Sequence, residues 1–269
     1  MADKDDLKST FLERGFSVHT LVNDSFTRED VLRRIALFLL DARGGDVRAV
    51  VFTGHAYETD DGSVLLIPPQ CSSMGDAIPE ADWEESIRTH AKPGVIVFSI
   101  LAHCYGNFMT QELDLSQTRS PSIQICDDST ETGPIFITFS ASSKSMPAYE
   151  SKLDMESSRV TDHFLSALLV TIRRPEVNDW PTFFKTFRHY FDMARANASR
   201  LCLDKSNEEL WRPKHPQEPW FTASKVVVSG TASLLWAQLM KHPFTNCGLE
   251  MLCVARVDFH TQHIEARMP

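Results

Sequence analysis

Strand-like apolar segments alternate with helix-like amphipathic segments along this chain, and that alternation limits the folds open to it more than any other feature. Nearly continuous apolar runs, which are typical of buried parallel strands, occur at residues 47–53, 95–101 and 135–139. Apolar residues recur at helical spacing over residues 27–40, 80–90, 159–173 and 180–201. The order strand, helix, strand predicts an α/β fold whose mainly parallel central sheet is flanked by helices.

Weaker signals extend this pattern towards both ends of the chain. A helix is expected over residues 6–14 and a strand over 16–21. The turn sequence Asp60-Asp61-Gly62 predicts a hairpin-like excursion after the strand at 47–53. Further strands are expected at 226–229 and 251–259, with a helix at 232–240 between them. Along the segment 180–201, five large side chains are expected to face inward, namely Phe183, Phe184, Phe187, Phe191 and Met193.

Composition and charge restrict both the compartment and the partners. The 269 residues, 42% of them hydrophobic, are sufficient for one domain over residues 1–269. The net charge of −9 argues against nucleic acid or an anionic membrane as partner, because both require a basic surface. The chain has no apolar run long enough to span a membrane and opens on acidic residues, so we expect a cytoplasmic or nuclear protein. Its six cysteines lack C-x-x-C spacing, which favours reduced thiols over a metal site or disulfides.

Two of the expected strands end in residues that can form a catalytic pair. His55 follows the strand at 47–53, and Cys104 follows the strand at 95–101. In an open α/β sheet, ligands bind beyond the carboxyl ends of the strands, so both side chains are expected in one crevice. A cysteine thiolate can attack a carbonyl carbon while a neighbouring imidazole transfers the proton. The separation of 49 residues matches the distance between the histidine and the cysteine in caspases.

The residues around this pair resemble the motifs of the caspase-like superfamily of cysteine peptidases, nearest to fungal metacaspase-like domains. Residues 52–56 (FTGHA) are similar to the family's F-S-G-H-G, and residues 100–106 (ILAHCYG) are similar to its L-D-x-C-x-S-G. Residues 139–142 (FSAS) and 148–150 (AYE) look like the S-A-S and A-x-E that follow the next strand. A Q-x-P near the domain end corresponds to residues 217–219 (QEP), so the ordered matches cover roughly residues 3–220.

The resemblance implies a caspase-like three-layer fold and a cysteine endopeptidase. In such an enzyme Cys104 attacks the scissile carbonyl and His55 handles the proton. The oxyanion would be held by the backbone N–H of Cys104 together with that of Gly54 or Ala56. No cofactor is expected, because the acidic loop that binds calcium in many metacaspases is reduced here to residues 60–61, which fall short of the oxygen ligands that calcium requires.

The resemblance also suggests how a peptide or protein substrate would bind. Ser140, Ala141 and Ser142 would form an exposed strand edge that pairs with an extended substrate. The family's acid two residues before the cysteine, which helps bind a basic P1 side chain, is replaced by Ala102. Asp3 stands where another family motif supplies a second pocket acid, so a basic P1 residue is slightly favoured.

Two features of the chain depart from the family's pattern of elements and loops. The chain starts at the family's first helix, so the strand that normally precedes that helix is absent. An unfilled gap would leave two unpaired strand edges, and we expect the segment 251–259 to fill it, with a partner chain or a second copy of this chain as the alternative. The polar loop at 114–133 occupies the place of the family's cleavable linker, and Arg119 within it is a candidate self-cleavage site.

Alternatives to a peptidase remain open at this stage. A catalytically weak or inactive relative that serves as a binding or assembly module is favoured by Ala102, by Ala56 and by the missing strand. A Cys/His site could also transfer its acyl group to an amine instead of water. His103 precedes Cys104 directly, so its side chain is expected to point away from the cysteine and to pack in the interior.

Overall fold

The computed structural model describes residues 2–22, 26–68, 71, 73–104, 113–114, 133–142, 148, 150–152, 160–177, 180–201, 217, 219–223 and 248–255. Their main element is a seven-stranded sheet with the order β1-β12-β2-β6-β8-β11-β7. The strands are β1 (Ser17–Val22), β12 (Leu249–Ala255), β2 (Val47–Thr53), β6 (Ile96–Ala102), β8 (Ile135–Ser140), β11 (Trp220–Ala223) and β7 (Leu113–Asp114). The first five are parallel, whereas β11 runs antiparallel to both β8 and β7.

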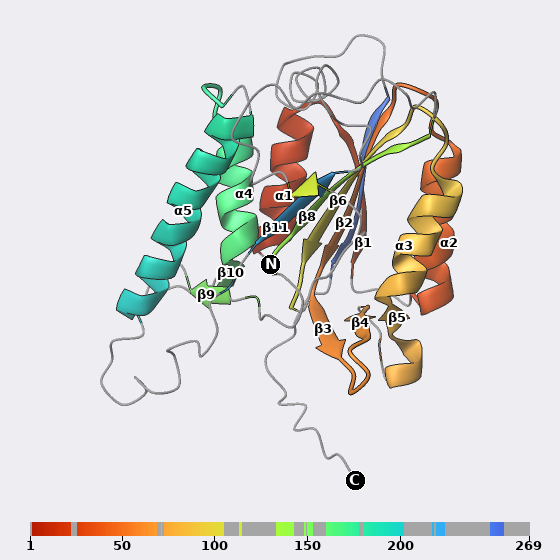
Figure 1. Ribbon diagram of the computed structural model, residues 1–269, viewed down its shortest axis with the longest axis horizontal. Coiled ribbons are helices and arrows are strands. Elements are labelled where there is room, and N and C mark those ends of the chain that lie inside the picture. The colour runs from red at the N-terminus through yellow and green to blue at the C-terminus, as the bar shows by residue number, and fades with distance from the viewer. Residues whose placement is uncertain are drawn as a thin grey trace.

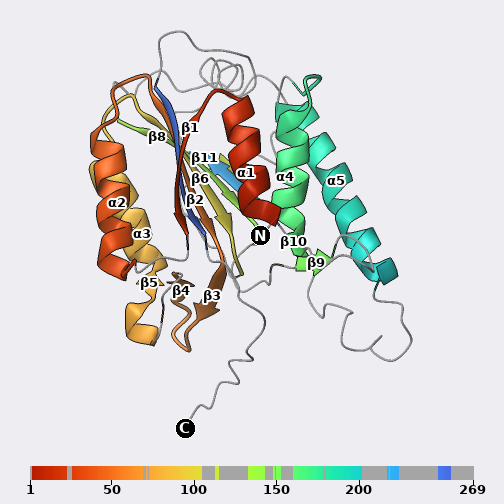
Figure 2. The same ribbon diagram turned by 180° about the vertical axis from the view of Figure 1, so that it is seen from behind.

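Helices cover both faces of this sheet (Figures 1 and 2). One face carries α1 (Ala2–Glu13), α4 (His163–Arg173) and α5 (Trp180–Leu201), and the other carries α2 (Arg28–Leu40) and α3 (Glu80–His90). The predicted α/β architecture, with a mainly parallel sheet between two helical layers, is therefore confirmed. Within the described part of the chain, none of the helices combines the length and the hydropathy that a bilayer crossing requires.

The helices begin and pack as their sequences dictate. The Thr27 hydroxyl accepts a hydrogen bond from the Asp30 N–H, and the Asp30 carboxylate accepts one from the Thr27 N–H, which forms a capping box at the start of α2. On α5, Phe183, Phe187 and Phe191 are buried as predicted. Met193 is 53% exposed, so its predicted inward orientation is wrong. The helix turns about 100° per residue, and position 193 lies beyond the stripe that faces the sheet.

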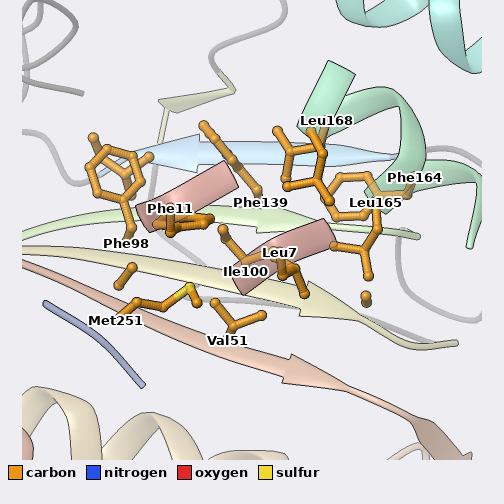
Figure 3. Close-up of a cluster of buried hydrophobic side chains, with 14 of the residues drawn as sticks. Leu7, Phe11, Val51, Phe98, Ile100, Phe139, Phe164, Leu165, Leu168 and Met251 are labelled. Atoms are coloured by element: carbon orange, nitrogen blue, oxygen red, sulfur yellow. The ribbon is translucent and has the colours of Figure 1, made fainter. Parts of the chain in front are cut away.

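Two apolar cores hold the three layers together. On the α1, α4 and α5 side, Leu7 and Phe11 of α1 form one cluster with side chains of α4 and of the sheet (Figure 3). On the other side, Trp83 packs against Phe52 with ring centroids 5.6 Å apart. Alternate residues of a strand point to opposite faces, so successive residues of β2 and β6 serve the two cores in turn. The ends of β2 and β6 are thus fixed from both sides.

β12 lies inside the sheet, between β1 and β2. This strand runs parallel to its two neighbours, with Glu250 opposite Ser17 of β1 and opposite Arg48 of β2. At its start, the Gly248 N–H donates to the Asp46 carboxylate (2.8 Å), and buried Arg48 donates to the Gly248 carbonyl (2.8 Å) and to Asp46 (3.1 Å). These contacts join the start of β12 to Asp46 and Arg48, about 200 positions earlier in the sequence.

Smaller elements lie outside the main sheet. A three-stranded sheet comprises β3 (His55–Glu58), β4 (Val64–Ile67) and β5 (Ile78–Pro79), next to a short helix η1 (Met74–Asp76). The predicted hairpin turn forms between β3 and β4, where Gly62 has a φ of +79° and the Asp61 carboxylate accepts from the Ser63 N–H. A two-stranded pair, β9 (Glu150–Lys152) and β10 (Val160–Asp162), precedes α4, so the helix predicted from residue 159 begins at His163. The segments predicted at 226–229 and 232–240 lie outside the described residues.

Candidate active site

Two neighbouring strands of the sheet end side by side at the candidate site. β2 and β6 pair in parallel up to Thr53 opposite Ala102, and the Gly54 N–H extends the pairing by donating to the Ala102 carbonyl (3.2 Å). His55 comes directly after Gly54, and Cys104 lies two residues beyond Ala102. The structure therefore brings the two predicted catalytic residues to the same edge of the sheet, just beyond the ends of two adjacent strands.

Cys104 is half-buried and contacts a residue from a different part of the chain. Its Sγ atom accepts a hydrogen bond from the Ala148 N–H (3.3 Å) and lies 3.6 Å from the Ala148 carbonyl oxygen, to which a thiol can donate. A half-buried thiol at a sheet edge is accessible to a substrate and held in place, as a nucleophile must be.

His55 is the first residue of β3 and is exposed to solvent. It lies opposite Ile67 in the pairing of β3 with β4, so the small sheet fixes its backbone while the imidazole faces outward. An exposed imidazole at this edge can exchange protons with a bound substrate and with water, as general acid–base catalysis requires.

His103 has a different environment from its neighbour Cys104. It is 1% exposed, and its ring packs against Phe52 with centroids 5.8 Å apart. Its Nδ1 donates to the Cys104 carbonyl (2.7 Å). Burial lowers the pKa of His103 from the usual 6.5 to about 4, so this imidazole is neutral at physiological pH. The prediction that His103 points away from the cysteine and packs in the interior is confirmed.

The candidate oxyanion donors differ in what they already bind. The Gly54 N–H is engaged by the Ala102 carbonyl, so it is not free to bind an oxyanion while β2 and β6 keep this pairing. Ala56, the alternative named from the sequence, lies in β3 opposite Leu66 and is half-buried. Of the two alternatives for the second donor, Gly54 is thus the one whose N–H is seen to be engaged in the main sheet.

The prediction that Ser140, Ala141 and Ser142 form an exposed strand edge is wrong. All three are at most 1% exposed, and β11 occupies the outer side of β8, with Trp220 opposite Ser140. The main chain of Ala141 is also engaged, since its N–H donates to the Leu101 carbonyl (2.8 Å) and its carbonyl accepts from Gln217 Nε2 (2.9 Å). An extended substrate cannot pair with main-chain groups that β6 and Gln217 already bind.

The two residues expected at a P1 pocket have different positions. Ala102 is 5% exposed and belongs to the core on the α1, α4 and α5 side. Asp3 lies in the first turn of α1, and only its backbone is described. Because α1 runs back from the carboxyl end of the sheet to the start of β1, its first turn lies at the same end of the molecule as the strand ends that carry the candidate site (Figure 1).

Other predicted site features lie outside the described residues or serve the fold. Arg119 falls outside the described part of the chain. In the β3–β4 turn, the Asp61 carboxylate accepts hydrogen bonds from Thr59 and Ser63, and these bonds lower its pKa. The same hydrogen bonds stabilise the turn. Among the described residues, no three His, Cys, Asp or Glu side chains are grouped as a metal site would require.

The match to known sequences decides the family. Residues 1–227 match the family model of the caspase domain. The chain belongs to the caspase-domain family. Membership supports a cysteine-peptidase-like function in general terms, although caspase-like proteins can also be inactive. Among solved structures, this caspase domain is similar to the crystal structure of protein GSU0716 from Geobacter sulfurreducens, with 15% identity, a TM-score of 0.48, and coverage of 69% of this chain and 77% of that one. No curated protein matches the chain.

Two residues of the caspase domain contribute contacts that sequence reasoning did not assign. Ala148 binds the sulfur of Cys104, and Gln217 binds the carbonyl of Ala141. Both stand in short motifs that carry the family resemblance, A-Y-E and Q-E-P, so the signal for their importance was present. Their roles could not be predicted, because a motif in a sequence does not show which distant group it contacts.

Proposed function

We propose that this caspase domain is a cysteine endopeptidase with Cys104 as nucleophile and His55 as general base and acid. The observation that supports this most directly is the position of both residues at one edge of the sheet, just beyond the ends of the adjacent parallel strands β2 and β6. The carboxyl edge of a parallel sheet is where α/β proteins bind their ligands. His103 is buried beside Phe52 whereas His55 is exposed, so His55 is the candidate base.

In the proposed reaction, His55 takes the proton of the Cys104 thiol, and the sulfur forms a bond to the scissile carbonyl carbon. The carbonyl electron pair moves to oxygen, where the N–H groups of Cys104 and Ala56 are the proposed donors. The C–N bond then breaks as His55 returns the proton to the departing amine. Water cleaves the resulting thioester, with its proton passing through His55 and back to the sulfur.

A basic P1 residue is the proposed preference. Asp3 is the acid available for it, since the first turn of α1 lies at the same end of the molecule as the candidate site. Position 102, where metacaspase-like sequences carry an acid, is a buried alanine and supplies no charge. With one acid in place of two, we expect Arg or Lys to be preferred only modestly at P1.

A catalytically weak or inactive binding module is the second candidate function. Two observations favour it, namely the absence of the acid at Ala102 and the engagement of the Gly54 N–H by the sheet. Loss of one oxyanion donor typically costs about 10²–10³-fold in turnover. A domain with these changes could retain the fold for assembly while its turnover falls.

The deciding experiment is cleavage of fluorogenic peptides with Arg, Lys, Asp or Asn at P1, with and without calcium. The wild type, Cys104→Ala and His55→Ala are compared with Cys253→Ala, which removes a buried thiol of β12. We expect activity in the wild type and in Cys253→Ala, and losses on the order of 10³-fold or more in the other two. A folded wild type that cleaves none of the peptides would support the binding module, whereas acyl transfer to an added amine would identify a transferase.

A further inference from the structure

The main chain of Ala148 contacts the sulfur of Cys104 with both of its polar groups. The Ala148 N–H donates to Sγ over 3.3 Å, and Sγ lies 3.6 Å from the Ala148 carbonyl oxygen. Both residues are half-buried, and Ala148 packs against the core on the α1, α4 and α5 side. Residue 148 follows β8, whereas Cys104 follows β6 and His55 follows β2, so the donor comes from a third segment of the chain.

The end of β8, which precedes Ala148 in the chain, is tied to the end of β6. The Ala141 N–H donates to the Leu101 carbonyl (2.8 Å), and the Ser142 hydroxyl donates to the His103 carbonyl (3.2 Å). These two contacts attach the end of β8 to the residues that directly precede Cys104. A backbone N–H that already points at the sulfur needs no reorganisation at the moment of reaction.

We propose that the Ala148 N–H activates Cys104 by stabilising its thiolate, an inference that rests on the proposed function and deepens it. A neutral thiol can donate to the Ala148 carbonyl and accept from the Ala148 N–H. On ionisation the S–H bond breaks, its electron pair stays on sulfur and the proton passes to a base, for which His55 is the candidate. The sulfur can then only accept, and a hydrogen bond to an anion is about twice as strong as one to a neutral group. The Ala148 N–H therefore favours the ionised form of Cys104.

The test measures alkylation of Cys104 by iodoacetamide as a function of pH, with mass spectrometry of the Cys104 peptide. Ala148→Pro removes the N–H, and Ala148→Gly is the matched control that keeps it. We expect Ala148→Pro to raise the midpoint of the profile by about one pH unit, which is about tenfold slower alkylation below the midpoint, with the same limiting rate at high pH. The profile of Ala148→Gly should stay within twofold of the wild type, and superimposable profiles for all three proteins would overturn the inference.

A second measurement needs no substitution at the donor. In protein labelled with ¹⁵N-alanine, the Ala148 amide resonance, assigned by its absence in Ala148→Gly, should shift with pH at the midpoint of Cys104 alkylation. The shift should disappear in Cys104→Ala, and an amide resonance that does not titrate would reject the donor role even if Ala148→Pro fails to fold. Neither readout requires a peptide substrate. If the Ala148 N–H affects the ionisation of Cys104 but no peptide is cleaved, only the proposed peptidase activity is rejected. If peptides are cleaved but the Ala148 N–H has no effect on Cys104, only this inference is rejected.

Discussion

His103 and Cys104 are neighbours in the sequence but face opposite environments. The strand β6 ends just before them, so consecutive side chains point to different faces of the sheet. His103 packs against Phe52 on the side of α2 and α3, whereas Cys104 contacts Ala148 on the other side. The histidine nearest to the nucleophile in sequence is thus a structural residue, and the more distant His55 is the candidate base.

The buried His103 makes the stability of the fold depend on pH. Burial lowers its pKa in the folded protein from 6.5 to about 4, so between these values the unfolded chain binds a proton that the folded protein does not. The free energy of unfolding should therefore fall by about 3 kcal/mol as the pH drops through this window. Above pH 6.5 His103 is neutral in both states, and the full stability is retained. Urea unfolding at pH 7.5 and pH 5 measures the part of this loss that falls above pH 5, about 2 kcal/mol.

His103→Phe is the variant that tests this assignment. It should reduce the pH-dependent loss and leave the part contributed by His163, whose pKa is also lowered to about 4, first by burial and then by the charge of Arg195. For each protein the comparison uses the difference between the free energies of unfolding at the two pH values. A destabilisation by the larger ring that is the same at both pH values therefore cancels. A variant with the same pH-dependent loss as the wild type would contradict the assignment.

At the scale of elements, local patterns predicted most helices and strands but not how polar strand ends are covered. β2 and α3 have the predicted bounds, because buried apolar runs and helical periodicity are properties of short segments. The family resemblance implied an exposed edge at the end of β8, yet β11 pairs with this strand as far as Ser140. That pairing joins residues about 80 positions apart, so it leaves no periodic signal in the sequence.

The capping box of α2 is an element-level prediction that stability measurements can test. The Thr27 hydroxyl accepts from the Asp30 N–H, so Thr27→Ala should lower the free energy of unfolding by about 1 kcal/mol. Thr27→Ser keeps the hydroxyl and should remain within a few tenths of a kcal/mol of the wild type. Urea unfolding at pH 7.5 compares the three proteins, and equal losses in both variants would show that the hydroxyl is not responsible.

At the scale of the whole molecule, the sequence predicted which segment fills the sheet but not what holds it there. The need to pair two open strand edges indicated the C-terminal segment. The contacts of Asp46 and Arg48 with Gly248 could not be predicted, because they join groups 200 residues apart. Burial alone would raise the pKa of Asp46, yet the N–H groups of Arg43 and Gly248 and the charge of Arg48 lower it, so the carboxylate that receives β12 is ionised at neutral pH.

The position of β12 links the C-terminal strand to the candidate site. Ala255 lies opposite Thr53, so β12 supports β2 up to the point where the chain turns to His55. A chain that ends at residue 247 would leave the facing edges of β1 and β2 unpaired, and we expect it to lose cooperative thermal unfolding and to aggregate. A chain that ends at Ala255 keeps every β12 pairing and should unfold cooperatively, as circular dichroism would show. Cooperative unfolding of the shorter chain would mean that β12 is dispensable and that the sheet closes without it.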